Sequence, residues 1–271
     1  MQDRDLPEIL KQLRNHPEHR TSFSATWTQG RSAFGGLSTA IAVCGITKLL
    51  PEPQPIRSLM VSFIGPIPPG EVVVVPRVQR QGKNVTQLAA DLLSNGELCL
   101  QIMAVFGNSR NSLTVPAAPA FNPEPRDLQR GFQRNTTAPP FLRYFEGAWT
   151  GGGIPFSGEK DHRLGIWARH RSDMRDFPIE KIIALADIPP PVILSHYTEP
   201  GVPASSLTWS LEFVKEPESI SDDWFYLDYQ IDHAAHGYTQ QSGKLFTEQG
   251  DLCALSRQCM VYFDQRVHKP A

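Results

Sequence analysis

The first half of the chain begins with one long apolar segment, followed by several shorter ones. Residues 34–50 are apolar on nearly every face, which predicts a helix buried all round, and three prolines within the next five residues end it. Four strands rich in valine and leucine are predicted next, at 57–64, 71–80, 85–94 and 97–106. Asn95-Gly96 predicts a tight hairpin between the last two strands.

The second half repeats this plan. A strand pair is predicted at 141–150 and 163–171, and Pro178 begins a short amphipathic helix. The helix ends at Asp187-Ile188, because Pro189-Pro190-Pro191 cannot continue it. Four more strands are predicted at 206–214, 224–232, 238–247 and 252–263.

Short motifs recur in the same order in both halves. Ser58–Phe63 is followed by Gly96-Glu97-Leu98-Cys99, and Ser206–Leu211 is followed by Gly250-Asp251-Leu252-Cys253. An ordered pair of matches indicates an internal duplication. The region between the halves is rich in proline and polar residues, which is typical of a linker. We therefore divide the chain into an N-terminal domain (1–110), a linker (111–140) and a C-terminal domain (141–271).

A helix wrapped by an antiparallel sheet, present twice, is the plan of a double hot-dog protein of the α+β class. Several motifs make the likeness specific: Arg31-Ser-Ala-Phe-Gly-Gly36, Ser58-Leu-Met-Val-Ser-Phe63, Arg80-Gln-Gly-Lys-Asn-Val-Thr86, the Asn95-Gly96 hairpin and Asp251-Leu-Cys-Ala-Leu-Ser-Arg-Gln258. In this order they resemble the acyl-CoA thioesterase II family over roughly residues 23–106 and 141–263. The resemblance implies an enzyme that hydrolyses acyl-CoA to a free acid and CoA.

The resemblance also implies a catalytic set. The family binds its attacking water with an Asp on the second helix, a Ser or Thr at the start of the next strand and a Gln on the last strand. These positions match Asp187, Ser206 and Gln258. The start of the first helix, at Gly35, Gly36 and Leu37, is the expected substrate-binding element.

The residues themselves support these roles to different degrees. Asp187 follows an apolar helix, where partial desolvation would raise its basicity, although an exposed helix-terminal Asp is the simpler interpretation. Ser206 could equally make a structural hydrogen bond, because Ser58 stands at the matching position of the first motif. Gln258 is more distinctive. When the two halves are aligned on Gly96 and Gly250, its counterpart is Ala104, which is apolar.

The same comparison predicts a single active site. The counterpart of Asp187, by the repeat of Ser58 at Ser206, is Thr39, which is no carboxylate. At Gly35-Gly36, small residues would let a ligand approach free N–H groups, which could hold the thioester oxygen or the CoA phosphates. Close packing of the helix against the sheet explains the two glycines equally well.

Composition excludes several other classes. The net charge is -2 with basic residues scattered, so nothing indicates nucleic-acid binding. Residues 1–20 lack the apolar core of a signal peptide, and 34–50 is too short and polar to span a membrane. The cysteines Cys44, Cys99, Cys253 and Cys259 form no CxxC pair, which fits reduced thiols in the cytoplasm.

Other chemistries lack their motifs. The chain has no G-x-S-x-G nucleophile elbow and no phosphate loop around Gly243-Lys244. His233 and His236 have no evident third ligand, so neither a metal nor a cofactor is expected. The expected partner is an acyl-CoA substrate, and a homo-oligomer is compatible with the fold but not required by the sequence.

Two departures from the family leave the acyl group open. The second helix is cut short by the three prolines, and Thr208 stands where the commoner form carries an acid. A fatty or an aromatic acyl group would both fit a tunnel lined by Leu, Val, Phe and Met. Two rival functions remain: a hot-dog hydratase or dehydratase, which needs an Asp–His pair on the helix, and a non-catalytic acyl-CoA or acyl-carrier binding module.

Overall fold

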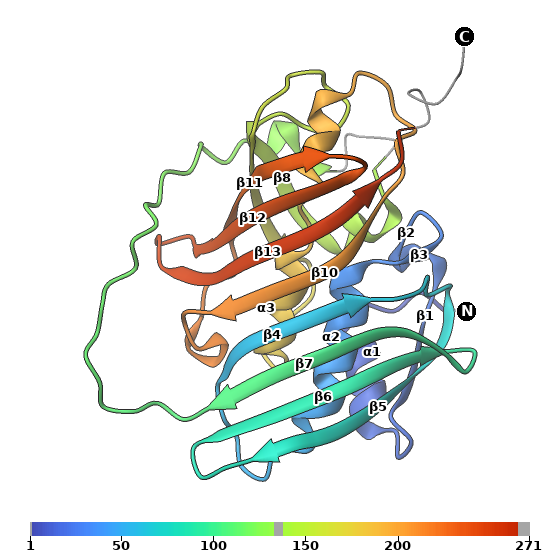
Figure 1. Cartoon of the computed structure of the whole chain (residues 1–271), viewed down its shortest axis with the longest axis vertical. Helices are drawn as coiled ribbons and strands as arrows, with labels where there is room; N and C mark the ends of the chain where they lie inside the picture. Colours follow the sequence, from blue (N-terminus) through green and yellow to red (C-terminus); the bar gives the residue numbers. More distant parts are fainter. Residues whose placement is uncertain (1, 133–137, 265–271) are drawn as a thin grey trace.

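A single antiparallel sheet of eleven strands forms the frame of the computed structural model, which describes residues 2–132 and 138–264 (Figure 1). The strand order is β1-β5-β6-β7-β4-β10-β13-β12-β11-β9-β8. The N-terminal elements are α1 (Leu6–Asn15), β1 (Arg20–Phe23), β2 (Thr28–Gln29), β3 (Ser32–Ala33), α2 (Gly35–Thr47), β4 (Ile56–Phe63), β5 (Gly70–Gln81), β6 (Val85–Ser94) and β7 (Glu97–Gly107). The C-terminal elements are β8 (Phe145–Gly152), β9 (Arg163–His170), α3 (Pro178–Ala186), β10 (Ala204–Phe213), β11 (Phe225–Ala235), β12 (Tyr238–Thr247) and β13 (Leu252–Tyr262).

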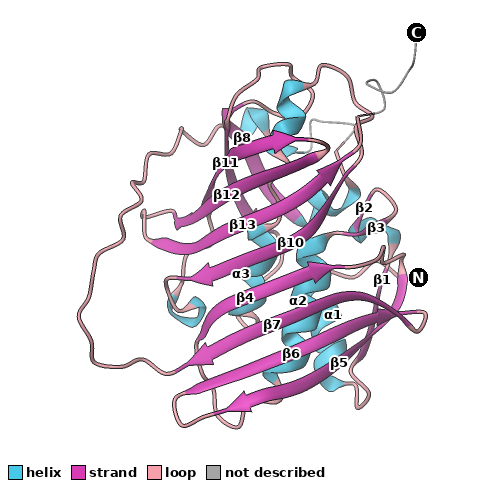
Figure 2. Ribbon diagram, viewed as in Figure 1, coloured by secondary structure: helices cyan, strands magenta, loops and turns pink. Residues whose placement is uncertain are grey.

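The two halves have the same strand order when counted outward from the centre of the sheet. β4-β7-β6-β5 on one side corresponds to β10-β13-β12-β11 on the other, and β4 and β10 pair with each other. The helices lie on one face of this sheet, as Figure 2 shows, and α2 contacts α3. Every residue of α2 from Gly36 to Ile46 is buried, which confirms the helix buried all round.

The hydrogen-bond pattern shows which residues of the two halves correspond. The Cys99 carbonyl accepts from the N–H groups of Ile64 and Gly65, and the Cys253 carbonyl accepts from those of Val214 and Lys215. Ala104 and Gln258 each lie five residues after these cysteines. They are therefore counterparts in space, as the repeated motif predicted.

The structure corrects the other two predicted correspondences, those of Ser206 and of Asp187. β4 has a bulge between Ile56 and Ser58, and β10 has one between Ser206 and Thr208, so the counterpart of Ser206 is Ile56 rather than Ser58. Thr39 lies inside α2, whereas Asp187 follows the last residue of α3, so these two do not correspond either. The Ser58–Ser206 match was therefore slipped by two residues relative to the strands, whereas the match of Gly96 with Gly250 was in register.

A helix that was not predicted covers the outer side of α2. α1 begins at Asp5, whose side chain accepts from the Glu8 N–H while the Glu8 carboxylate accepts from the Asp5 N–H. Its buried face consists of Leu6, Pro7, Ile9, Leu10 and Leu13. This face adds to the core of the N-terminal half.

The segment before β8 bows outward beside the strand ends in Figure 1, and its later part is anchored to the C-terminal half at several points. The Phe121 ring packs against Trp167, Tyr226 and Phe246. The Trp167 Nε1 donates to the Glu124 carbonyl at 2.8 Å, and the Arg126 guanidinium lies over the Trp224 ring. The domain boundaries at 110 and 141 stay a prediction, and residues 133–137 of the predicted linker lie outside the described residues.

Candidate active site

Asp187 stands where the two halves meet. It is the C-cap of α3, and the three prolines that follow it end the helix there. The Tyr229 hydroxyl donates to the Ala186 carbonyl and so holds this last turn. Burial raises the pKa of the Asp187 carboxyl to about 7, although hydrogen bonds from Gln258 and from the Gly36 backbone act in the opposite direction.

The Asp187 carboxylate is held from both halves. The Gln258 Nε2 donates to Asp187 Oδ1 at 2.7 Å, and the Gly36 N–H at the start of α2 is its backbone donor. The N-cap residue of α2, Phe34, makes no side-chain cap hydrogen bond. Asp187 therefore supplies the capping carboxylate for a helix of the other half, where the positive end of the helix dipole favours its charge. An exposed helix-terminal Asp is ruled out by this placement.

Gly35 leaves the space that Asp187 occupies. A Cβ added at Gly35 would lie 2.6 Å from Asp187 Oδ2 and 3.1 Å from Cε1 of Phe63. No side chain fits there unless the carboxylate moves. This close approach explains the glycine that the sequence places at the helix start.

If Asp187 activates the attacking water, as the family resemblance implies, Gly35→Ala is expected to lower kcat/KM for thioester hydrolysis by about 10- to 100-fold, because a carboxylate displaced by a fraction of an ångström misaligns that water. Steady-state kinetics against Gly65→Ala measures this. Gly65 lines the same cavity, but a Cβ there has no neighbour closer than 3.7 Å. Equal activity of the two variants would contradict the role given to the Gly35–Asp187 contact.

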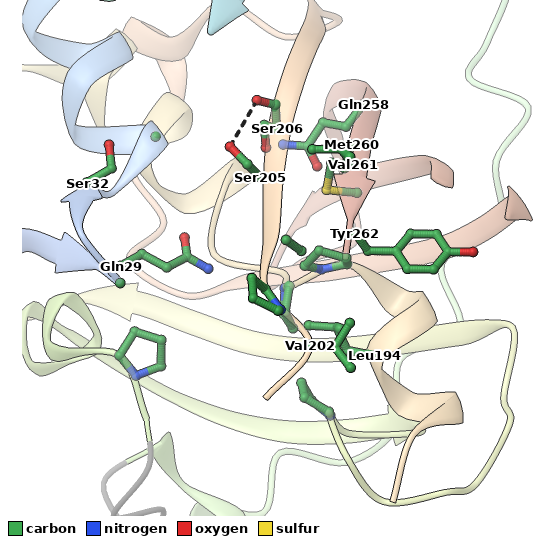
Figure 3. Close-up of a pocket in the computed structure, with 18 of the residues that line it drawn as sticks. Gln29, Ser32, Leu194, Val202, Ser205, Ser206, Gln258, Met260, Val261 and Tyr262 are labelled. Carbon is green, nitrogen blue, oxygen red and sulfur yellow. Dashed lines mark hydrogen bonds between the residues drawn. The ribbon is translucent and has the colours of Figure 1, made fainter. Parts of the chain in front are cut away.

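Ser206 reaches the inner face of the sheet because of the β10 bulge. Its cross-strand partner is the buried Met260, whose side chain points to the same face as Gln258. Figure 3 shows Ser205 and Ser206 beside Gln258 and Met260 at the edge of the cavity. Within residues 2–132 and 138–264, no hydrogen bond joins the Ser206 hydroxyl directly to Asp187 or Gln258, so the three side chains share a cavity rather than a continuous bond network.

The expected substrate-binding residues differ in their placement. Gly35 lines the cavity, whereas Leu37 is fully buried in the core and the Gly36 N–H faces Asp187. The Gly36 N–H is therefore not an open donor for a substrate oxygen in this structure. Close packing accounts for Gly36, because an added Cβ would lie 2.6 Å from the Phe34 ring and 3.1 Å from the Ala184 backbone.

A cavity of about 1750 Å³ opens beside these residues and takes its walls from both halves. Asp187, Ser206 and Gln258 lie on it together. Its other walls are mostly apolar or aromatic and include Phe63, Phe141, Trp149, Phe156, Leu194 and Val202. Figure 3 shows Gln29 and Ser32 reaching it from the N-terminal half, opposite Gln258. The cavity can hold an apolar chain with its carbonyl near the carboxylate.

One buried residue of the site was not singled out from the sequence. Gln241 on β12 lies directly opposite Gln258 on β13, and its Nε2 donates to Gln258 Oε1 at 2.9 Å. The sequence did contain an indication of Gln241: it is a polar residue at an inward position of a strand whose residues alternate between buried and less buried. Gln241 could not be distinguished from the neighbouring Gln240, because the sequence does not show which of two adjacent glutamines faces inward.

Throughout the part of the chain that the structure describes, no three His, Cys, Asp or Glu side chains come together as metal ligands. No helix among the described residues is long and apolar enough to cross a bilayer.

Known structures share this architecture. A conserved protein of unknown function with a hot dog fold from Alicyclobacillus acidocaldarius superposes with a TM-score of 0.78 at 21% identity, covering 90% of this chain and 92% of that one. The tesB protein of Mycobacterium avium subspecies paratuberculosis gives a TM-score of 0.74 at 16% identity over 96% and 100% of the chains. An acyl-CoA thioesterase II from Mycobacterium marinum gives 0.66 at 19% identity over 88% and 92%. The predicted double hot-dog fold is confirmed.

Sequence models identify the family. The model of the acyl-CoA thioesterase N-terminal domain matches residues 23–107, and that of the C-terminal domain matches residues 116–262. The chain therefore belongs to the acyl-CoA thioesterase family, which confirms the resemblance seen in its motifs. A search of curated protein sequences finds no match.

Proposed function

We propose that the chain hydrolyses acyl-CoA thioesters to a free acid and CoA, using a water activated by Asp187. The observation that carries this proposal is the carboxylate itself. It has a pKa raised to about 7, is held by donors from both halves, and lies on a large apolar cavity. A group with that pKa is half ionised near neutral pH, where a general base works best.

The proposed reaction needs no covalent enzyme intermediate. Asp187 takes a proton from a water positioned by Gln258 and Ser206, and the water oxygen bonds to the thioester carbon. The tetrahedral intermediate then collapses with cleavage of the carbon–sulfur bond, and the leaving thiolate takes the proton back from Asp187. The α2 N-terminus beside the carboxylate supplies a positive potential for the negative oxygen of the intermediate.

The apolar walls favour an acyl group without charge, either fatty or aromatic, as the part of the substrate inside the cavity. The four cysteines are free thiols, three of them buried, which supports the cytoplasm as the location. The rival hydratase lacks its histidine, because α3 contains none. A binding module would have no need of a carboxylate with this basicity.

Release of free thiol from a panel of acyl-CoAs tests the proposal, with a chromogenic thiol reagent as the readout. We expect turnover of at least one apolar acyl-CoA, rising with pH through about 7 as Asp187 ionises. Tight binding of acyl-CoA with no thiol release would favour the binding module. A change in enoyl-CoA absorbance without thiol release would favour a hydratase.

A further inference from the structure

A chain of three hydrogen bonds leads from the backbone after the proline run to Asp187. The Val192 N–H donates to Gln241 Oε1 at 3.1 Å, Gln241 Nε2 donates to Gln258 Oε1 at 2.9 Å, and Gln258 Nε2 donates to Asp187 Oδ1 at 2.7 Å. Gln241 and Gln258 are 1% and 2% exposed, so water does not compete for these amide groups.

The direction of every bond in this chain follows from its first member. A backbone N–H can only donate, so Gln241 must present its oxygen to Val192 and its NH₂ to Gln258. Gln258 must then accept through its oxygen, which leaves its NH₂ for Asp187. Without this anchor, the Gln258 amide could turn over and place its oxygen against the carboxylate, which would repel the ionised form.

The proline run determines which backbone N–H is available to anchor Gln241. Residues 189–191 have no N–H, and the Ile188 N–H donates to the Leu185 carbonyl, so Val192 carries the first backbone donor after Asp187 that is not used within the last turn of α3. Val192 also opens the 3-10 helix Val192–His196, where its N–H is free of intrahelical bonding. Both ends of the hydrogen-bond chain therefore belong to one short segment, which closes a ring through Gln241 and Gln258.

We propose that Gln241 is a positioning residue which, held by the Val192 N–H, fixes the Gln258 amide with its Nε2 toward Asp187. The role deepens the proposed function and rests on it for its catalytic meaning. Gln241 itself touches neither the cavity nor the expected substrate, so it acts only through Gln258. The proline run, which departs from the family's usual pattern, is then part of the site rather than a simple helix stop.

The variant that tests this is Gln241→Met, which keeps the length of the side chain and removes both polar ends. Because a donor to the carboxylate is no longer fixed, the pKa of Asp187 should rise. The acidic limb of the kcat/KM profile should move up by about 0.5 to 1 pH unit, with kcat about 10-fold lower. Gln240→Met is the matched control, since Gln240 lies next to it on the opposite face, near the Cys259 thiol, and should leave the profile unchanged.

A second readout needs no activity at all. The ¹³C NMR titration of the Asp187 carboxyl, assigned by its loss in Asp187→Asn, follows this group in the substrate-free protein. It separates Asp187 from the other titratable side chains nearby, which are Tyr229 against the end of α3 and the cavity-lining Arg31, Tyr197, His236, Tyr238, Tyr262 and Asp264. If wild type releases no thiol, the proposed function fails while this measurement still decides the role of Gln241.

Val192→Pro guards against a Gln241 variant that does not fold. It removes the anchoring N–H and replaces the buried Val192 side chain by a ring of similar size, at the first position of a 3-10 helix that already follows proline, where a proline backbone is tolerated. We expect the titration midpoint of Asp187 to rise in this variant as well. An Asp187 midpoint equal to wild type in folded Gln241→Met or Val192→Pro would overturn the proposal.

Discussion

Asp187→Asn is expected to lower kcat by at least roughly 100-fold, the scale of losing a general base. The amide keeps an oxygen that can accept from Gln258 and from the Gly36 N–H, so the start of α2 stays capped. Binding of the acyl-CoA should survive, because the carboxylate acts on water. Stopped-flow or steady-state thiol release measures the turnover, and calorimetry with a non-hydrolysable thioether analogue measures binding.

The stability of the same variant should change in the opposite direction. Burial raises the pKa of Asp187 from 3.8 to about 7, so its contribution to stability should be greatest below pH 4, fall as the pH rises toward 7, and then level off. Asp187→Asn should therefore be more stable than wild type at pH 8, by on the order of a few kcal/mol, and about equal at pH 4. Urea unfolding at both pH values measures the difference.

Comparing Asp187→Asn with wild type removes the contribution of other titratable groups from the measured difference in stability. Glu180, also buried in α3, has a pKa raised to about 7 by its burial and contributes to the pH dependence of both. Its contribution cancels in the difference. Full turnover in folded Asp187→Asn would remove the carboxylate from the mechanism, and a stability difference independent of pH would show that Asp187 is ionised without penalty.

Gln258→Ala is expected to lower kcat/KM on the order of 100-fold, because the attacking water loses a ligand and its fixed orientation. The acidic limb of the pH profile should also move upward, since the carboxylate loses its 2.7 Å donor. The profile distinguishes this from a general loss of structure, which would lower activity at every pH alike. Thiol release between pH 5 and 9 provides both quantities.

The duplication offers a matched control in Gln101. Its Nε2 also donates to a carboxylate, that of Asp91 at 2.9 Å, but Asp91 pairs with Arg77 on the outer face of the sheet. Gln101→Ala should therefore change kcat/KM little. Similar losses in the two variants would mean that both halves take part in the reaction and that the single-site prediction is wrong.

The fold could be predicted because its signals are local. The strands of both halves, the Asn95-Gly96 hairpin and the helix ending before Asp187 all lie within a few residues of their predicted places. α1 was missed, although Asp5 and Glu8 form a capping box and its apolar residues recur at helical spacing. Residues 1–20 were considered only as a possible signal peptide, and no helix was predicted there.

The site could be predicted only through single residues. Asp187 and Gln258 do meet, but the sequence does not show that Gly36 of the other half would join them. The motif repeat also paired Ser206 with Ser58, when the bulges pair it with the buried Ile56. That correction strengthens the asymmetry, since both strand positions that are polar in the C-terminal half, Ser206 and Gln258, are apolar in the N-terminal one. Contacts across the halves depend on strand register, which short motifs do not fix.

The hydrogen bond from Gly36 to Asp187 makes the reactivity of this carboxylate depend on how the two halves are seated on each other. The halves meet along β4 and β10, where Trp209 lies opposite Val61. Any repacking along this seam that draws Gly36 away takes a donor from the carboxylate and raises its pKa. Sequence changes along the seam are therefore expected to shift the pKa of Asp187 without altering any side chain that contacts the carboxylate.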